Sequence, residues 1–481
     1  MRPLEICLLV IGLVAALSLL SNRSRQIGRI LVGLSLAVLV AHAIVEGAHW
    51  QMIPAYLALA LLCVTGWKRE SAGKPGLVRI SACVLALLLL GASGAASYVL
   101  PMFRLPKPTG SYPVGTAILY LKDSSRMEDA APVAGQPREL MVQLWYPAAD
   151  SSNRWARYRE PRETNWTGSY QTAISTNSRL KAPMAAAGAP FPVILFNHGW
   201  ESRRTNDTFL TEELASHGYV VASIDHTYNA SLVAFPDGRE ARSNASKLVD
   251  NPEAGTADQV RAVWDKELAK QMLDERFVLD QLQTMSESPA SPWYGRMNTR
   301  LAGAIGHSFG GAAATDICAV DPRVRGAINM DGWFFGAIRA RNANRGASQP
   351  LLFMQTTGDD YRLPSDPRSS VSAALEAEDA ADLTDSLQRF GGYVLTFKGA
   401  EHDDFTDQGL VSPLRRFSYA GTIPAREMET AVRAYVVAFF DRTLHGADPA
   451  ILRPGARPFS EAALSVFPEG KTAASQTGQA K

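Results

Sequence analysis

Cysteine is scarce in this sequence, with four residues in a chain of 481. Cys7, Cys63 and Cys83 fall in apolar runs of the first hundred residues, and Cys318 is the only cysteine in the rest of the chain. Because a single cysteine cannot form an internal bridge, the sequence excludes a disulfide framework for the larger C-terminal part.

Net charge is nearly absent as well, because 48 Lys and Arg residues are balanced by 47 Asp and Glu residues. With a hydrophobic content of 46%, this balance excludes a disordered chain and a nucleic-acid binder driven by bulk charge. Residues 1–100 nevertheless hold eight basic and three acidic residues, whereas the other 381 hold 40 and 44. A sparsely positive, apolar part therefore precedes a mildly acidic part that is long enough to bury a large core.

The sequence also lacks metal-ligand spacings, a phosphate-cradling loop and a dinucleotide fingerprint. We therefore expect neither a cofactor nor a metal, and no nucleic acid partner.

Four apolar stretches dominate the first hundred residues. Roughly 20 apolar residues in a helix cross the ~30 Å hydrocarbon core of a membrane. Four such stretches with short polar links favour spanning helices over buried core helices or a cleaved signal peptide. They cover Pro3–Leu20, Ile27–Val45, Met52–Trp67 and Ile80–Leu100, of which the third is the shortest. Residues 1–100 are therefore predicted to form a transmembrane segment of four helices.

Basic residues in the links predict the orientation of this segment. The first link holds three arginines and the third holds four Lys or Arg residues, whereas the second holds none. The positive-inside rule places the first and third links in the cytoplasm. We therefore expect a multi-pass protein of the cell membrane whose C-terminal domain is extracytoplasmic.

Residues 101–113 are rich in proline and predict a stiff linker. Residues 114–446 alternate between short apolar runs and amphipathic stretches, which predicts a mostly parallel sheet with helices on both faces. Strands are expected at Val114–Tyr120, Leu140–Tyr146, Val193–Asn197, Tyr219–Ile224, Leu301–Ile305, Val324–Met330, Leu351–Gln355 and Tyr393–Phe397. Helices are expected at Thr208–His217 and Thr256–Met285, after Phe309, and at 371–389 and 425–444.

Three stretches show no such pattern. The polar stretch up to about residue 190 and the insertion 228–255 have no periodicity. Residues 447–481 are predicted to be a C-terminal extension, whose end has the composition of a disordered tail.

The most informative motif is Gly306–Gly310, a G-x-S-x-G pattern between a predicted strand and a predicted helix. Such a serine lies on a sharp turn where side chains two residues away on either side would collide, so glycine is required there. The small residues that follow allow the helix to pack close to the sheet. The pattern predicts Ser308 as a nucleophile, with a structural turn as the alternative.

A serine needs a base to take its proton, and in this architecture the base follows the nucleophile and the acid along the chain. Only His402 and His445 follow Ser308. His445 lies at the end of a predicted helix, whereas His402 follows a predicted strand, at the sheet edge where α/β folds present catalytic groups. His402 is therefore the predicted base.

Two aspartates at strand ends are candidates for the acid that orients the histidine. Asp331 follows the strand Val324–Met330, and Asp359 follows Leu351–Gln355. Most α/β-hydrolases place the acid after the later strand, which favours Asp359, but the residues alone leave both candidates open. Each Asp has an alternative role as a turn residue.

The oxyanion of an acyl-transfer reaction needs backbone donors. One predicted donor is the N–H of Phe309, beside the nucleophile. The other is the N–H of Trp200, in the loop after Val193–Asn197.

Several motifs resemble, in order, those of the plasma and intracellular type II platelet-activating-factor acetylhydrolases, which are α/β-hydrolases. They are Asn197-His198-Gly199 with Arg204-Thr205, Leu214–Gly218, Gly306–Gly311, Asp331-Gly332-Trp333 after Met330, and Gly399–His402. The resemblance spans roughly residues 110–445. It implies hydrolysis of a short acyl ester without cofactor or metal.

Position by position, the resemblance implies Ser308 as nucleophile, Asp331 as acid and His402 as base, with Trp200 and Phe309 as oxyanion donors. The chain departs from the family's plasma member in its membrane segment. We therefore expect a membrane-anchored serine esterase or lipase that acts on carboxylic esters, including short-acyl phospholipids. The alternatives are a polyester or cutinase-like hydrolase and a non-catalytic membrane-bound binding module with a hydrolase fold.

Overall fold

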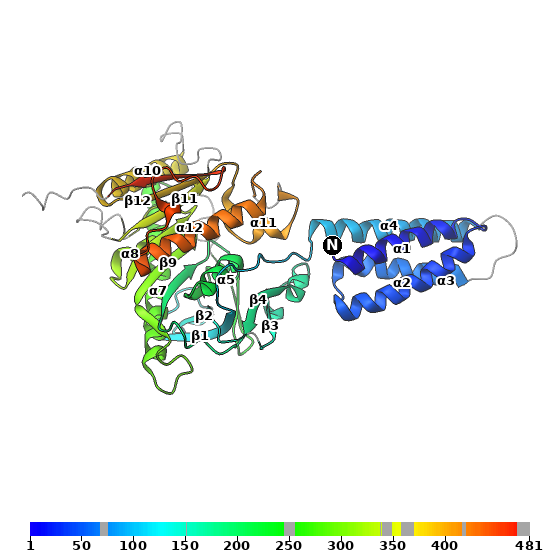
Figure 1. Cartoon of the computed structure of the whole chain (residues 1–481), viewed down its shortest axis with the longest axis horizontal. Helices are drawn as coiled ribbons and strands as arrows, with labels where there is room; N and C mark the ends of the chain where they lie inside the picture. The colour runs from blue at the N-terminus through cyan, green and yellow to red at the C-terminus, as the bar shows by residue number, and fades with distance from the viewer. Residues whose placement is uncertain are drawn as a thin grey trace, which may run out of the picture. The chain divides into compact units, whose positions relative to one another are not determined.

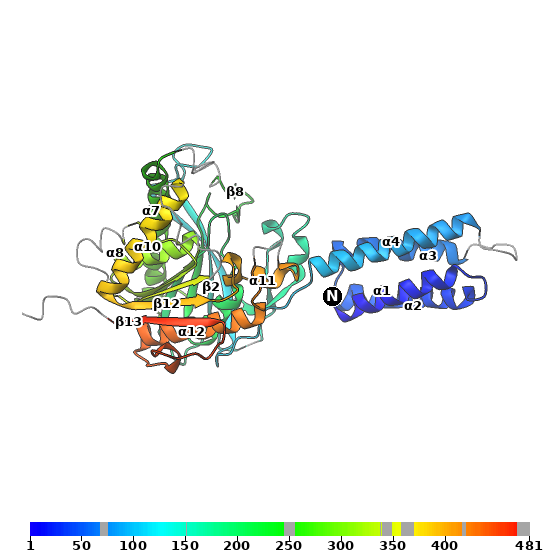
Figure 2. The ribbon, with the colours of Figure 1, turned by 90° about the horizontal axis from the view of Figure 1, so that it is seen from above.

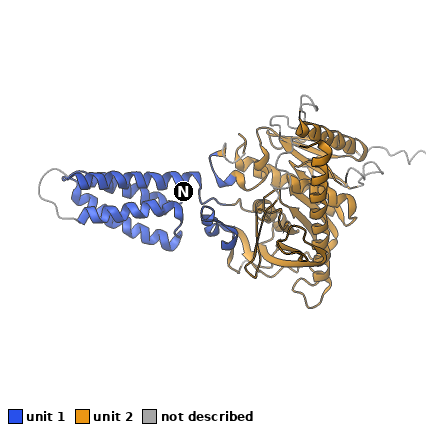
Figure 3. Ribbon diagram, turned by 180° about the vertical axis from the view of Figure 1, so that it is seen from behind, with its two compact units in different colours: residues 1–104, 157–175, 410–414 blue, residues 105–156, 176–409, 415–481 orange. Residues whose placement is uncertain are grey.

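The structure is a computed structural model that describes residues 1–67, 76–150, 152–244, 255–336, 338, 349–356, 370–415 and 420–468. The chain divides into two compact units (Figure 3). Unit 1 comprises residues 1–104, 157–175 and 410–414, and unit 2 comprises residues 105–156, 176–409 and 415–481.

Four helices in unit 1 pack into a bundle (Figure 1). They are α1 (Pro3–Leu19), α2 (Arg25–Val45), α3 (Ile53–Trp67) with the preceding turn η1 (Trp50–Met52), and α4 (Leu77–Val99). The interior is built largely of small and leucine side chains, such as Ala15, Ala58 and Leu59. Large apolar residues face outward instead, including Ile30 at 64% and Leu88 at 67% exposure. An outer surface of this kind is typical of a helix bundle in lipid.

Among the described residues, three helices of the bundle are long and apolar enough to cross a membrane: Arg25–Val45, Trp50–Trp67 and Leu77–Val99. The helix α3 has 15 residues and is the shortest of the four, as the sequence pattern predicts, and α1 has 17. The turn η1 continues directly into α3, and together they cover the 18 residues Trp50–Trp67. A fourth spanning helix stays a prediction.

Unit 2 is built around an eleven-stranded, mostly parallel sheet (Figures 1 and 2). The order of its strands is β13-β12-β11-β10-β9-β5-β6-β2-β1-β4-β3. The strands are β1 (Val114–Met127), β2 (Pro137–Pro147), β3 (Trp155–Arg157), β4 (Ser175–Leu180), β5 (Phe191–Asn197), β6 (Val220–Asp225), β9 (Met297–His307), β10 (Val324–Met330), β11 (Leu351–Thr356), β12 (Gly392–Phe397) and β13 (Ala462–Phe467). The run from β6 through β5, β9, β10 and β11 to β12 is parallel throughout.

Helices cover both faces of the sheet, as the alternating pattern predicts. One group packs together on one face and comprises α7 (Ala257–Glu287), α8 (Phe309–Val320) and α10 (Val371–Phe390). On the other face lies α12 (Ala425–His445), as Figure 2 shows, together with α5 (Thr208–Ser216), which packs against α12. Short helices lie at Pro161–Glu163 (η2), Ser169–Ala173 (η3), His402–Phe405 (η5), Gln408–Val411 (α11) and Ala450–Leu452 (η7).

Local signals at helix ends agree with the structure. The N-cap Thr256 accepts a hydrogen bond from the Gln259 backbone at 3.3 Å, and the Gln259 side chain accepts one from the Thr256 backbone at 2.9 Å. This is the predicted capping box of α7. At the end of α12, Gly446 adopts a φ of 71°, which is the left-handed helix stop expected after His445.

Five short strands were not predicted. The strands β3 and β4 come from the polar stretch before residue 190, and the hairpin β7 (Leu232–Ala234) and β8 (Glu240–Arg242) lies in the insertion. They are short, and apolar residues do not alternate clearly along them, so period-2 patterning gives no signal. The last strand, β13, pairs antiparallel with β12 and lies within the predicted C-terminal extension 447–481.

Candidate active site

The carboxyl ends of three adjacent parallel strands bring the predicted site residues together. The central strand β9 pairs with β5 on one side and with β10 on the other. Ser308 follows β9, Asp331 follows β10, and the loop at Trp200 follows β5. Because parallel strands end at the same edge of the sheet, residues far apart in sequence become neighbours.

Ser308 lies on a strained turn between β9 and α8. Its φ of 56° and ψ of −125° are unusual for a residue with a side chain. A Cβ atom added at Gly306 would lie 2.1 Å from the Gly310 carbonyl oxygen, and one at Gly310 would lie 2.3 Å from that of Asn197. The two glycines of the motif are thus required by close backbone contacts. This geometry is that of a nucleophile elbow.

Asp331 and His402 form a close pair. The Oδ2 atom of Asp331 lies 2.7 Å from Nδ1 of His402. The other carboxylate oxygen, Oδ1, accepts a hydrogen bond from the backbone N–H of Thr356 at 3.1 Å. The Asp331 side chain is fully buried, whereas that of His402 is 44% exposed. A fixed carboxylate therefore orients an imidazole whose other nitrogen is available for chemistry.

The other candidates for acid and base lie elsewhere. Asp359 lies outside the described residues. His445 ends α12 and packs its ring against Tyr219, with 5.5 Å between the ring centroids. Among the described residues, Asp331 is the predicted acid that contacts His402.

His307 is a site residue that the sequence analysis did not single out. Its Nε2 donates a hydrogen bond to the backbone carbonyl of His402 at 2.9 Å, and the two rings lie 4.5 Å apart. Burial, followed by the nearby His402, lowers the pKa of His307 to about 3, so the ring is neutral. His307 occupies the variable position before the serine, where the motif itself carries no signal.

The loop after β5 approaches Ser308 closely. A Cβ atom at Gly199 would lie 3.1 Å from the Cβ atom of Ser308. The side chains of Trp200 and Phe309, whose N–H groups are the predicted oxyanion donors, pack edge to face with centroids 4.8 Å apart. The two predicted donor residues therefore lie together beside Ser308.

His198 fixes the backbone of this loop. Its Nδ1 donates to the carbonyl of Gly199 at 2.7 Å, and its Nε2 accepts from the backbone N–H of His226 at 3.2 Å. Burial lowers the pKa of His198 to about 4, so it holds the single proton that this pattern needs.

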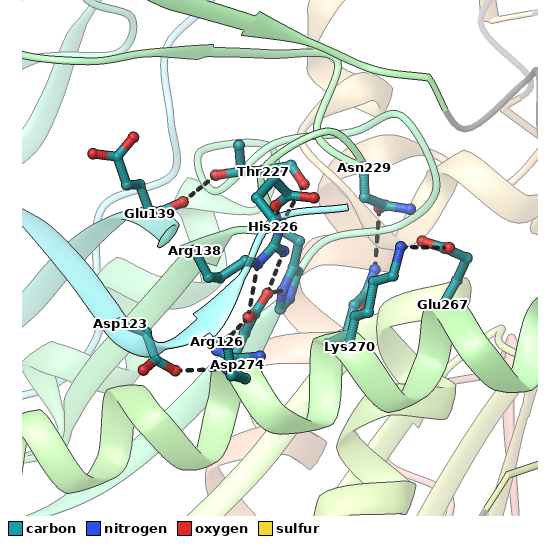
Figure 4. A network of polar contacts seen from close by, with 12 residues as sticks. Asp123, Arg126, Arg138, Glu139, His226, Thr227, Asn229, Glu267, Lys270 and Asp274 are labelled. Carbon is teal, nitrogen blue, oxygen red and sulfur yellow. Dashed lines mark hydrogen bonds and ion pairs between the residues drawn. The ribbon is translucent and has the colours of Figure 1, made fainter. Parts of the chain in front are cut away.

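A buried polar network, drawn in part in Figure 4, contacts Asn197 at the end of β5, where this loop begins. The Nε and Nη2 atoms of Arg138 donate hydrogen bonds to the two carboxylate oxygens of Asp274, at 3.1 and 2.6 Å. The same carboxylate lies 3.0 Å from Nδ1 of His226. The opposite nitrogen of His226 contacts the side-chain oxygen of Asn197 at 3.1 Å. Because the Arg138 cation offsets burial, the pKa of Asp274 is held far below its usual range. Arg138 lies in β2, Asn197 in β5 and Asp274 in α7, and His226 directly follows β6, so no local motif links these residues.

An aromatic cluster lies next to Ser308. Phe309 packs in one apolar cluster with Trp264 and Phe335, and with the partly buried Trp200 and Trp333. The rings of Trp264 and Trp333 lie 3.9 Å apart. An acyl or aryl group bound near Ser308 would therefore meet aromatic surface.

Comparisons with known proteins agree with this geometry. Residues 99–448 match the sequence profile of a family described as platelet-activating factor acetylhydrolase, isoform II. The chain is similar to a probable 1-alkyl-2-acetylglycerophosphocholine esterase of Arthroderma benhamiae, 24% identical over 409 residues, which cover 77% of this chain and 96% of the relative. It is also similar to the platelet-activating factor acetylhydrolase of Canis lupus familiaris, 25% identical and covering 62% and 72% of the two chains.

One solved structure is similar over nearly its full length. A ferulic acid esterase from Streptomyces cinnamoneus is 31% identical, with a TM-score of 0.59 and an alignment that covers 75% of this chain and 99% of that one. Together with the strand order, this similarity establishes the predicted α/β-hydrolase fold.

Proposed function

Because the chain belongs to the platelet-activating factor acetylhydrolase isoform II family, we propose that it is a membrane-anchored serine hydrolase that cleaves carboxylic esters through an acyl-enzyme. The observation that carries this proposal is the 2.7 Å contact between Asp331 and His402, at the same sheet edge as the strained Ser308. A nucleophile, a base and an orienting acid are the groups that ester hydrolysis requires.

The proposed reaction begins with attack of Ser308 Oγ on the ester carbonyl. Because Nδ1 of His402 faces Asp331, its Nε2 takes the serine proton, and the carboxylate stabilises the resulting imidazolium. The backbone N–H groups of Trp200 and Phe309 stabilise the oxyanion. His402 then returns the proton to the leaving alcohol, which yields an acyl-Ser308 ester.

Water completes the cycle. His402 takes a proton from a water molecule, whose oxygen attacks the acyl-Ser308 carbonyl. The same oxyanion donors act again, and the proton passes to Ser308 Oγ as the carboxylic acid leaves. The net reaction consumes one ester and one water and produces one acid and one alcohol.

Two ester classes are proposed as substrates. Short-acyl phospholipids are favoured by the similarity to the Arthroderma benhamiae esterase. Aromatic acyl esters are the second candidate, since an aromatic cluster flanks the nucleophile and the ferulic acid esterase is similar. Polyester cleavage and a purely binding role are the remaining alternatives.

A substrate panel tests this proposal with the full chain in detergent micelles. The panel consists of p-nitrophenyl acetate, butyrate and octanoate, a 2-acetyl ether phospholipid, methyl ferulate and a polyester film. We expect turnover of acetyl esters, with the ratio of phospholipid to ferulate kcat/KM identifying the class. Absence of turnover on all six would favour the binding module.

The membrane part of the proposal concerns the bundle of unit 1. Apolar residues on its outer surface and the basic first and third links support a multi-pass anchor with an extracytoplasmic hydrolase domain. Protease added to intact cells that express the chain should digest the hydrolase domain. Protection until the cells are lysed would contradict the proposed orientation.

A further inference from the structure

Four side chains of the kinds that ligate metals meet at one end of the helix bundle, within unit 1. Glu5 lies in the first turn of α1, His42 in the last turn of α2, Glu46 directly after α2, and His49 just before η1. The residues Glu5, His42 and His49 are 1%, 0% and 8% exposed, and the Glu46 side chain is 9% exposed. We call these four residues the bundle cluster. It plays no part in the proposed hydrolysis.

We propose that the bundle cluster binds one divalent transition-metal ion, with zinc as the best match, through Glu5, His42 and Glu46. One ligand atom from each of these residues lies within 4.8 Å of the other two. Ligand atoms around a tetrahedral zinc lie roughly 3.4 Å apart, given bond lengths of about 2.0–2.1 Å. Small side-chain shifts would therefore bring all three atoms onto one ion. Mixed imidazole and carboxylate ligands suit zinc better than magnesium or calcium.

The spacing along α2 supports a shared ligand face. His42 and Glu46 are four residues apart, so they lie one helical turn from each other. The Nδ1 atom of His42 is 3.0 Å from Oε2 of Glu46. The opposite nitrogen, Nε2, is 2.8 Å from the hydroxyl of Tyr56. A hydrogen bond to the distal nitrogen is the arrangement that orients metal-bound histidines and fixes their tautomer.

His49 lies beside the three proposed ligands and contacts one of them. Its Nε2 atom is 3.0 Å from Oε1 of Glu5, and its Nδ1 atom is 2.8 Å from the side-chain oxygen of Gln51. The Gln51 side-chain nitrogen in turn donates to the Leu100 carbonyl at 3.2 Å. His49 therefore helps to position Glu5 and is not one of the three ligands.

Arg2 already holds a positive charge beside the two carboxylates. Its Nε atom is 2.5 Å from Glu5 Oε1 and 3.9 Å from Glu46 Oε2. The guanidinium group also donates to the backbone carbonyl of Gly47 at 3.1 Å. Since two like charges at one site repel, the guanidinium and the metal ion compete for the carboxylates. Arg2 is the counter-ion of the metal-free state, and its removal should strengthen metal binding.

The test uses the full chain in detergent, freed of metal by a chelator and titrated with Zn²⁺ alone. We expect one zinc per chain by elemental analysis, and a rise in the Tm of the chain on zinc addition. The variants Glu46→Gln and His42→Gln should lower zinc affinity at least tenfold. The matched control His445→Gln, which removes a histidine outside the bundle cluster, should bind zinc as the unaltered chain does.

Two further variants distinguish the loss of a metal ligand from a distortion of the bundle. Glu46→His, which restores a ligand, should recover zinc binding that Glu46→Gln loses. Arg2→Gln should bind zinc more tightly than the unaltered chain. Equal zinc binding in the unaltered chain and in His42→Gln, or weaker binding in Arg2→Gln, would overturn the proposal. In that case the bundle cluster is a proton-holding network only.

Discussion

The carboxylate of Asp331 is held from two sides, by Nδ1 of His402 at 2.7 Å and by the backbone N–H of Thr356 at 3.1 Å. The second contact ties the end of β10 to the end of β11, its neighbour in the sheet. A carboxylate that is fixed in this way keeps the imidazole in one orientation. The proposed acid is therefore positioned by the sheet itself.

Asp331→Asn should lower kcat by ~10⁴ while leaving the Tm nearly unchanged. An amide at this position favours the wrong tautomer of His402, as loss of the acid does in other triads. The measurement is hydrolysis of p-nitrophenyl acetate by the purified variant. Asp359→Asn, assayed on the same ester, is the matched control and should have little effect. If Asp359→Asn loses kcat to this extent and Asp331→Asn does not, the acid follows β11 and the assignment of Asp331 is wrong.

His307→Phe should lower kcat about 10- to 100-fold with little change in KM. The variant loses the donor that holds the His402 carbonyl, and small displacements of a catalytic group have effects of this size. His307→Gln retains an N–H donor and should recover most of the rate. Equal loss in both variants would indicate a packing role for the ring instead of positioning of His402.

Gly199→Ala should reduce kcat by about 10- to 100-fold. The new methyl group would lie 3.1 Å from the Ser308 Cβ, so the loop must move and its oxyanion donor moves with it. Gly91→Ala, where a Cβ atom meets nothing within 4 Å, is a matched control for the loss of a glycine. Full activity of Gly199→Ala would exclude this loop from the oxyanion site.

Glu212 should make stability depend on pH. It lies in α5, and burial raises its pKa from 4.5 to about 7 in the folded chain. Above pH 4.5 the unfolded chain ionises this carboxyl while the folded chain keeps its proton. Stability should therefore fall between about pH 4.5 and 7, by on the order of 1–3 kcal/mol.

Glu212→Gln removes this titration and should make the Tm less dependent on pH. The amide keeps a partner for Asn177 and Ser178, which contact the carboxylate at 2.8 and 2.5 Å. Thermal unfolding of both proteins at pH 5 and pH 8 measures the effect. A variant that is no more stable than the unaltered chain at pH 8 would show that folding does not raise the pKa of Glu212.

Local sequence signals were sufficient for the central strands and for the nucleophile turn. Val324–Met330 matches its predicted bounds, and the motif itself calls for the glycines around Ser308, one of which is required by a contact with Gly310 and the other by a contact with Asn197. Local sequence signals could not choose between Asp331 and Asp359 as the acid. Both follow neighbouring parallel strands, so spacing along the chain does not distinguish them, whereas the pairing of Asp331 with His402 depends on side-chain positions that spacing does not give.

Polar clusters whose residues come from different elements could not be predicted from the sequence. The network behind the loop at Asn197 joins Arg138, His226 and Asp274 from three elements. The bundle cluster likewise joins Glu5 to His49 across 44 residues. The first has no characteristic spacing, and in the second only His42 and Glu46 do, since they are four residues apart on α2. The pairing of elements brings the other residues together.

The most direct test of the account is ester hydrolysis by the full chain with Ser308 intact and with Ser308→Ala. The unaltered chain should turn over p-nitrophenyl acetate and should be labelled at Ser308 by a fluorophosphonate. Ser308→Ala should lose about 10⁴-fold or more in kcat, fail to be labelled and keep its Tm. Hydrolysis by Ser308→Ala at a rate near that of the unaltered chain would contradict the proposed serine mechanism.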